Sequence, residues 1–279
     1  MLIYLVIAFV FISTFLLGKV LEKFRVPWIF AALILGSALA IYNPVSMVTD
    51  SEVFSFLAQL GMYFLLFLVG LELDVKELKD KGAFIFKSTF FIIFFEGIVG
   101  SIFVHFVFNY SWVISLLISL SFATVGEAIL IPILDEFNLV NTTLGQAIIG
   151  IGTLDDLIEI FTLVASSFIV GAKAESNLTP VVISLVLMIV LTFFLTRMKK
   201  ESEKFKFLQI ESLFIFVLFV FFLFIGVGSF AEAAPLGALF AGISLRTFLP
   251  EERLSFIESE IKSLTYGFFG PLFFLWVGL

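Results

Sequence analysis

Long apolar runs constrain the fold of this chain more than any other feature of its sequence. They recur along its whole length, at about residues 2–18, 27–42, 53–73, 83–108, 112–134, 142–171, 179–196, 208–229, 233–245 and 266–279. Each run has the length of a membrane-crossing helix or comes close to it. Because backbone polar groups inside a bilayer must be satisfied within the segment, the runs predict helices. We therefore expect an all-α polytopic membrane protein with ten spans, surrounded by lipid.

The composition supports this fold class. Hydrophobic residues make up 61% of the 279 and charged residues 14%, which excludes a water-soluble domain of this length. The chain has no cysteine, which excludes disulfides and thiolate metal sites. Its 40 phenylalanines are expected to face lipid or to pack, and neither a cofactor nor a nucleic-acid partner is expected. The net charge of -7 is attributed to solvated loop acids such as Glu251, Glu252, Glu258 and Glu260.

The basic residues predict the orientation in the membrane. When ten spans are threaded from an outside N-terminus, fifteen of the sixteen Lys and Arg residues lie on the cytoplasmic side, and Lys173 lies outside. This bias is what the positive-inside rule predicts. The first run is expected to be retained, because no basic residue precedes it and no small-residue cleavage site follows it. The predicted location is the cytoplasmic (inner) membrane.

Two stretches of the chain resemble each other and predict an internal repeat. The distance from Pro27 to Val69 and the distance from Pro235 to Val277 are both 42 residues, and Val-Gly-Leu stands at the end of each stretch. Since seven spans separate the two copies, the second copy enters the membrane from the opposite side. Inverted repeats of this kind are typical of secondary transporters with a substrate site at the membrane midplane. The alternative is a chance similarity between two apolar segments.

The repeat also predicts that the chain is the N-terminal part of a longer protein. The first copy continues for about a hundred residues to the end of the sixth span, whereas the second ends at Leu279. We expect about three further spans, thirteen in all.

Three acids in the sixth apolar run are the first candidate site. Asp155, Asp156 and Glu159 lie near the middle of residues 142–171. A charged side chain at mid-bilayer costs about 3 kcal/mol on insertion scales, so it usually faces a wet cavity, a partner or an ion. On a helix, Asp155 and Glu159 share a face, and Asp156 points about 100° away. We expect a site where a proton and a monovalent cation compete. The alternatives are a neutralised structural pair for the aspartates and polar packing for Glu159.

The fifth run supplies further candidates. Ser121, Thr124 and Glu127 interrupt it near its middle, close to Gly126. Such residues favour a local unwinding, and the freed carbonyls with Thr124 and Asp156 would then suit a hard cation. Close helix packing through small residues would explain the serines equally well, but not Glu127. In the fourth run, Glu96 either lines the ion path or hydrogen-bonds a neighbouring helix.

At this point the sequence resembles the monovalent cation:proton antiporter family, in its bacterial Nha and Kef-like branch. The resemblance extends over the whole chain. It is carried by Phe67-Leu68-Val69-Gly70-Leu71-Glu72-Leu73-Asp74, Ser121 to Glu127 with Pro132-Ile133-Leu134, Leu144-Gly145-Gln146, Thr153-Leu154-Asp155-Asp156, Ala234-Pro235-Leu236-Gly237-Ala238-Leu239-Phe240-Ala241-Gly242 and Pro271-Leu272-Phe273-Phe274. The paired aspartates are its most specific part.

The resemblance implies an inverted-repeat antiporter fold with a discontinuous helix. It implies a homodimer in which residues 1–81 and 208–279 form a dimerisation domain, residues 82–172 belong to a core that moves like an elevator, and residues 173–207 link the two. It also implies that Asp156 is the principal carrier of Na+ or K+ and of protons. Asp155 would distinguish electrogenic members from electroneutral ones, which have Asn there. Glu127 and Glu159 depart from the family pattern.

Three other functions are weighed against cation/proton exchange. A Kef-like potassium efflux system would carry a cytosolic regulatory domain after its last span. A non-transporting fragment would keep only the dimerisation surface. An intramembrane aspartyl protease needs its two aspartates on separate helices, whereas Asp155 and Asp156 are adjacent on one, so we expect a transporter and not an enzyme.

Overall fold

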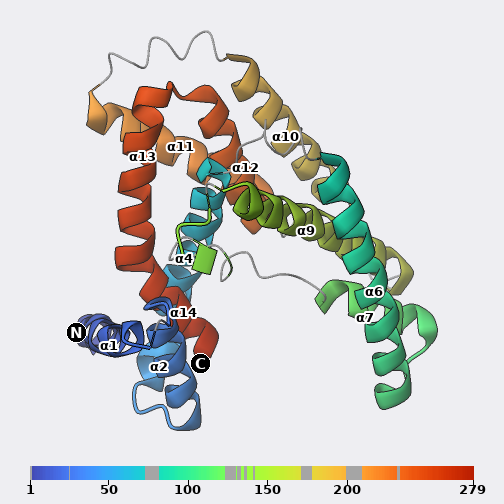
Figure 1. Cartoon of the computed structure of the whole chain (residues 1–279), viewed down its shortest axis with the longest axis horizontal. Coiled ribbons are helices and arrows are strands. Elements are labelled where there is room, and N and C mark those ends of the chain that lie inside the picture. Colours follow the sequence, from blue (N-terminus) through green and yellow to red (C-terminus); the bar gives the residue numbers. More distant parts are fainter. Residues whose placement is uncertain are drawn as a thin grey trace. The chain divides into compact units, whose positions relative to one another are not determined.

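The computed structural model describes residues 2–24, 26–72, 82–122, 130, 133–134, 137–140, 142–170, 178–198, 209–230 and 233–279. Within these ranges all regular secondary structure is helical, as predicted (Figure 1). The helices are α1 (Leu2–Glu22), α2 (Ile29–Ile41), α3 (Ser46–Thr49), α4 (Glu52–Glu72), α6 (Gly82–Phe108), α7 (Trp112–Phe122), α9 (Thr143–Val170), α10 (Leu178–Arg197), α11 (Ile210–Ser229), α12 (Ala234–Phe248), α13 (Glu251–Leu264), the π-helical turn η2 (Thr265–Phe269) and α14 (Gly270–Gly278).

Most of these helices coincide with predicted spans. In the described part of the chain, α1, α4, α6 and α11 are both long and apolar enough to cross a membrane. Shorter apolar helices lie at α2, α7 and α12. The chain is therefore an integral membrane protein with several spans, and the count of ten stays a prediction.

Contacts between helices divide the chain into two compact units. The first comprises Met1–Glu72 and Ser184–Leu279, and the second comprises Leu73–Ile183. The assignment of the first unit to dimerisation and of the second to ion translocation stays a prediction.

The core of the first unit is formed by α4, α11 and α12 together with η2. Phe64 and Phe221 lie with ring centroids 4.4 Å apart, and Phe64 stacks on Phe269 at 4.9 Å. The Phe67 ring also packs against Phe221, with centroids 5.0 Å apart. Aromatic pairs at such distances add about 0.5–1.5 kcal/mol each beyond the area they bury.

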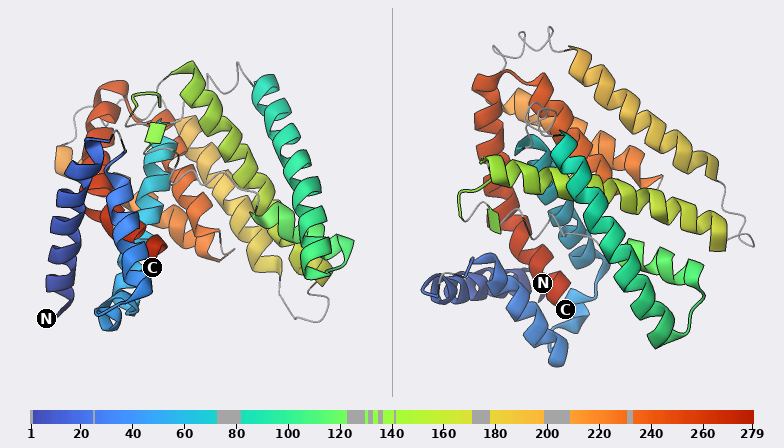
Figure 2. Two further views of the ribbon diagram at one scale, coloured as in Figure 1. Left: turned by 60° about the horizontal axis from the view of Figure 1, so that its bottom comes forward. Right: turned by 45° about the vertical axis from the view of Figure 1, so that its right-hand side comes forward.

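Two helix crossings in the first unit depend on glycine. A Cβ atom at Gly70 in α4 would collide with the Leu239 carbonyl and with Gly242 in α12, and one at Gly242 would collide with Gly70. Gly36 in α2 and Gly278 in α14 are related in the same way, since a Cβ atom at either glycine would collide with the other helix. The helices α2 and α14 lie side by side in Figures 1 and 2. Each crossing therefore joins one helix of the first predicted repeat, α2 or α4, to one helix of the second, α12 or α14.

Charged residues fasten the end of α4 to α12 and α13. The Arg246 guanidinium donates from Nη1 to the Leu71 carbonyl at 2.7 Å and approaches Glu258 Oε1 at 3.4 Å. Lys262 Nζ lies 3.9 Å from Glu72 Oε1. Burial raises the pKa of Glu258 above its ordinary value, and the nearby Arg246 and Lys262 partly oppose this.

The structure corrects the expectation that four of the acids lie in a loop. Glu251, Glu252, Glu258 and Glu260 lie on the helix α13, not in a loop. The helix is amphipathic, since it buries Ile257 and Ile261 while its acids lie on other faces. Sequence reasoning missed it because the spanning-length criterion finds only uniformly apolar helices.

The last continuous helical rod, formed by α13, η2 and α14, contains a π-helical turn. Residues Thr265–Phe269 join α13 to α14, and the Gly270 N–H donates to the Thr265 carbonyl five residues earlier. The predicted span at 266–279 is thus the apolar end of a longer rod that begins at Glu251.

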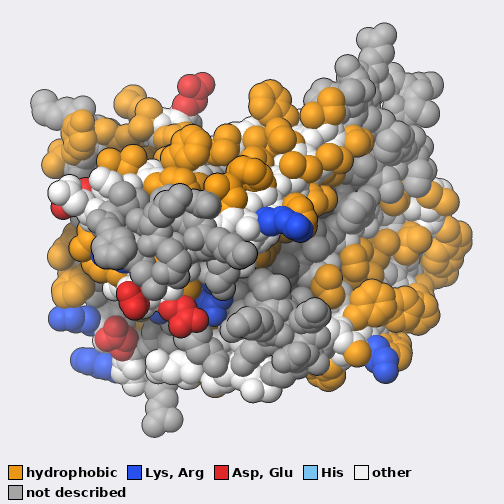
Figure 3. Space-filling model, turned by 90° about the horizontal axis from the view of Figure 1, so that it is seen from above, with side chains coloured by type: hydrophobic (Ala, Val, Ile, Leu, Met, Phe, Trp, Pro, Cys, Tyr) orange, Lys and Arg blue, Asp and Glu red, His pale blue; other side chains and the backbone are white. Residues whose placement is uncertain are grey.

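The second unit contains α6, α7 and α9. A tight turn joins α6 to α7, and Asn109 adopts the left-handed conformation there with φ 57°. Asn tolerates this conformation better than most residues. The outer surface of α6 is rich in exposed phenylalanine, including Phe84, Phe86, Phe90, Phe91 and Phe94. Hydrophobic side chains also cover much of the molecular face drawn in Figure 3. An exposed apolar surface of this extent fits a helix that faces lipid.

Candidate functional site

The helix that carries the predicted site, α9, begins with a well-formed cap. Thr142 accepts a hydrogen bond at Oγ1 from the Gly145 N–H at 3.1 Å, as an N-cap residue does. The Gln146 side chain donates to the Val140 carbonyl at 3.0 Å. A Cβ atom at Gly145 would collide with the Leu139 carbonyl. The segment Leu144-Gly145-Gln146 therefore fixes how the chain enters α9.

The aspartates lie near the middle of α9, as predicted. The helix runs without interruption from Thr143 to Val170, so Asp155 and Glu159 are one helical turn apart. Asp155 is buried, with 4% of its surface exposed. The side chains of Asp156 and Glu159 lie outside the described part of the structure.

A second acid approaches Asp155 from α6. Glu96 lies close enough to Asp155 for their carboxylates to interact electrostatically. Its Oε2 atom is buried and has no hydrogen-bond partner among the described residues. Nearer the start of α6, the Thr89 hydroxyl donates to the Ile151 carbonyl of α9 at 3.5 Å. The structure therefore packs the helix that carries Glu96 against the helix that carries Asp155, although the two acids are more than fifty residues apart in sequence.

Small residues hold α7 against α6 beside this acid. The Ser119 hydroxyl donates to the Glu96 backbone carbonyl at 2.8 Å. A Cβ atom at Gly100 would collide with Ser119, and one at Gly97 would lie 3.1 Å from Leu120 Cδ2. The Ser119 contact was not predicted, because it depends on the register between two helices. The glycines spaced three apart were the available signal of close packing.

Of the two serines in α7 that the structure describes near the predicted interruption, only Ser119 contacts a neighbouring helix, which fits the packing interpretation for that residue. The Ser121 hydroxyl donates to the Leu117 carbonyl at 2.8 Å, within its own helix, and Ser119 joins two helices. Thr124 and Glu127 lie outside the described residues. The predicted unwinding between Ser121 and Glu127 therefore stays a prediction.

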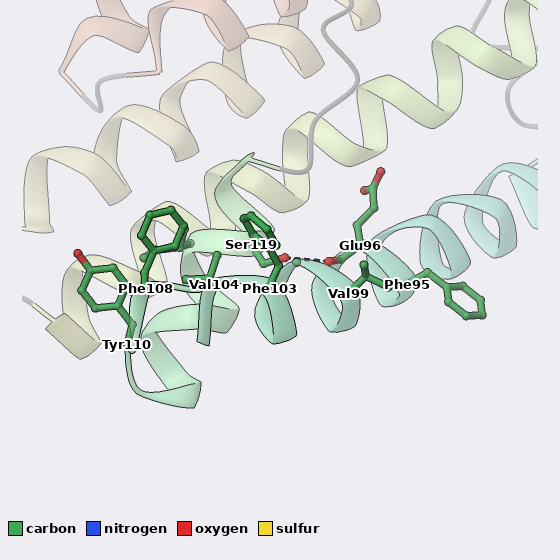
Figure 4. A pocket seen from close by; sticks show the side chains of 10 residues that line it. Phe95, Glu96, Val99, Phe103, Val104, Phe108, Tyr110 and Ser119 are labelled. Carbon is green, nitrogen blue, oxygen red and sulfur yellow. Dashed lines mark hydrogen bonds between the residues drawn. The ribbon is translucent and has the colours of Figure 1, made fainter. Parts of the chain in front are cut away.

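A cavity of about 830 Å³ lies between α6 and α7 next to Glu96. It is lined by Phe95, Glu96, Val99, Gly100, Phe103, Val104, Phe108, Tyr110, Ile118 and Ser119. In Figure 4, Phe108 and Tyr110 lie at one end of these residues, and Phe95 and Glu96 lie at the other. The cavity thus extends from the turn between the two helices to the middle of α6.

In chemical terms, the site offers oxygen ligands and proton-binding groups. Among the residues that the structure describes, no three His, Cys, Asp or Glu side chains are grouped closely enough to hold a metal ion. Two neighbouring carboxylates in a low-dielectric environment disfavour simultaneous ionisation. A proton or a cation at such a pair relieves their repulsion. This arrangement suits reversible binding of small cations.

Comparisons with known proteins agree with this chemistry. A family model described as "Sodium/hydrogen exchanger, transmembrane" matches residues 7–279. The chain is 28% identical over 288 residues to the probable Na(+)/H(+) antiporter 3 of Methanocaldococcus jannaschii, covering 99% of this chain and 71% of that protein. It is 25% identical to the Na(+)/H(+) antiporter of Enterococcus hirae, covering 98% and 72%.

A third relative is named for potassium. The glutathione-regulated potassium-efflux system protein KefC of Shigella flexneri is 25% identical over 260 residues, which is 88% of this chain and 40% of that protein. These relatives are transporters and not enzymes. The match to residues 7–279, together with these relatives, shows that the chain belongs to the transmembrane sodium/hydrogen exchanger family of cation:proton antiporters.

Proposed function

We propose that the protein exchanges a monovalent cation, Na+ or K+, for protons by alternating access, with Asp156 as the principal carrier and Asp155 beside it. The observation that supports this most is the buried Asp155 near the middle of α9, a helix that packs against α6, which carries the acid Glu96. Ionised acids in hydrocarbon are too costly to keep without a compensating partner. Exchange uses that cost, because each cation that leaves is replaced by a proton.

The energy available is of the right size. Each net charge that crosses 100 mV yields about 2.3 kcal/mol, and a tenfold concentration gradient yields about 1.4 kcal/mol. These values exceed thermal energy, so a site that binds either ion can be driven in one direction. No covalent chemistry is needed.

The replacement of Asp156 by Asn tests the proposal. The full-length protein is reconstituted into liposomes that contain a pH-sensitive dye, and a pulse of NaCl or KCl is added outside. We expect D156N to abolish cation-dependent proton flux, because the amide cannot exchange a proton for a cation. The matched control is Asp50→Asn, at an exposed position outside the predicted site. Undiminished flux in D156N would remove Asp156 from the mechanism.

The same assay separates the alternatives. The KefC relative favours potassium as a second candidate, and a proton flux that responds to KCl but not to NaCl would support it. Reconstitution of residues 1–279 alone tests the third candidate. If this chain is a non-transporting fragment, its liposomes will give no flux with either salt, while a longer chain from the same reading frame will.

The proposed architecture follows the predicted domains. We propose a homodimer in the inner membrane with the N-terminus outside, in which the unit containing α6, α7 and α9 moves across the other unit. Two units separable by their contacts suit such a motion. Crosslinking between two copies through cysteines introduced on α1 tests the dimer.

A further inference from the structure

The cavity between α6 and α7 has the dimensions of a small-molecule site. Its volume is about 830 Å³. Ligand pockets in proteins usually measure roughly 300–1,000 Å³ and are mostly apolar with a few polar groups. The distance along the helix from Glu96 to Phe108 is about 18 Å, at about 1.5 Å per residue. The cavity is therefore long enough for an elongated or bulky organic molecule.

The lining residues limit the chemistry of an occupant. The walls are aromatic and aliphatic, with Phe95, Phe103 and Phe108 among them. Among the described residues that line the cavity, the ionisable groups are the Glu96 carboxylate and the Tyr110 phenol. A hydrated alkali ion would find few oxygen ligands along this surface, and an organic anion would meet an acid without a compensating base. A molecule with an apolar body and one positive charge complements both features.

The Glu96 carboxylate gives the cavity a polar end. Its Oε2 atom is buried and has no hydrogen-bond partner among the described residues. At the other end, Phe108 and Tyr110 lie close to the α6–α7 turn (Figure 4). Aromatic faces attract cations, so a cation is favoured along the path to Glu96.

We propose that this cavity binds a lipophilic organic cation, with its apolar groups against Phe103 and Phe108 and its charge directed toward Glu96. The site lies wholly between α6 and α7, within one unit of the structure. It does not require the protein to exchange ions. A failure of the proposed exchange would therefore leave the cavity proposal standing, and the reverse also holds.

Two other occupants are outcomes of the test. A lipid acyl chain would fill the cavity without regard to charge. A helix from a longer version of the chain would fill it permanently and exclude any small molecule. A cavity that binds cations but not anions would be a site for an organic cation. A cavity that binds both would fit an acyl chain, and a cavity that binds neither would be filled by a helix.

A pair of lipophilic ions of equal shape provides the probe. Radiolabelled tetraphenylphosphonium and tetraphenylborate are equilibrated with the full chain in lipid nanodiscs, and empty nanodiscs correct for partition into lipid. We expect saturable binding of the phosphonium, at one site per chain, and no saturable binding of the borate. Equal saturable binding of both ions, or of neither, overturns the proposal.

Four variants locate the binding. Glu96→Gln should weaken phosphonium binding about tenfold, which corresponds to about 1.4 kcal/mol. Val99→Trp should weaken it by filling the cavity and keeps the charge of Glu96. Phe103→Ala, which removes part of the lining, should also weaken it, whereas Phe94→Ala on α6, which does not line the cavity, should leave it unchanged. Binding that none of the first three variants alters would place the cation elsewhere and overturn the proposal.

Discussion

At the scale of single residues, Arg246 does more for the described structure than its position near a helix end suggests. The last carbonyls of a helix have no partner within that helix. Arg246 donates to one of them, the Leu71 carbonyl of α4, and also approaches Glu258 of α13. One side chain thus joins three helices at a point where an unpaired backbone group would otherwise be left.

Replacement of Arg246 by Ala should lower the free energy of unfolding by about 1–3 kcal/mol, because it leaves the Leu71 carbonyl and the partly buried Glu258 without this partner. Arg246→Lys keeps the charge but not the planar guanidinium, and should recover only part of the loss. Thermal unfolding in detergent measures both. Arg197, which is exposed beside Phe193, is the control, and Arg197→Ala should stay within about 0.5 kcal/mol of wild type. Equal effects at the two positions would contradict this role of Arg246.

At the scale of elements, the two glycine crossings hold the first unit together. Gly70 and Gly242 contact each other where α4 meets α12, and Gly36 and Gly278 contact each other where α2 meets α14. Each crossing brings two backbones to a distance that no side chain permits. Close approach through small residues is a main source of helix association in membranes.

Gly70→Ala and Gly242→Ala should each destabilise the protein by about 1–3 kcal/mol through overpacking against backbone. The double variant should cost less than the sum, because one separation of α4 from α12 relieves both clashes. Gly226→Ala in α11 is the control, since an added Cβ there meets no atom within 4 Å. It should be neutral or slightly stabilising. Additive losses at Gly70 and Gly242 would show that the two sites do not share a crossing.

How much could be predicted from the sequence also differs between elements. Runs such as 83–108 and 142–171 predicted α6 and α9 to within one residue at each end, because apolar length in a bilayer dictates helix. The amphipathic α13 was missed because it is not uniformly apolar, and apolar length was the criterion for a helix. The approach of Glu96 to Asp155 was also beyond prediction, since it depends on the rotation of α6 against α9. The position of Asp155 near the middle of a long helix, by contrast, followed from its place in an apolar run.

At the scale of the whole molecule, the absence of cysteine makes the predicted orientation easy to test. Met47 is 84% exposed between α2 and α4, on the predicted outer side, and Ser263 is exposed on α13, on the predicted cytoplasmic side. Met47→Cys should react in intact cells with a thiol reagent that cannot cross membranes. Ser263→Cys should react only in inverted vesicles.

Phe91→Cys serves as the control for this labelling, because an exposed position on a lipid-facing helix should react from neither side. Reaction of both test positions from the same side would mean that the number of spans between them is wrong. Reaction of each from the side opposite to the prediction would reverse the orientation and leave the span count intact.

The π-helical turn at Thr265–Phe269 has a consequence for how α14 meets its neighbours. One residue more than an α-helical turn needs shifts the phase of everything that follows by about 100°. Gly278 therefore points about 100° away from the direction it would take if α13 continued into α14 as an unbroken α-helix. The close contact of Gly278 with Gly36 in α2 thus depends on the extra residue in this turn.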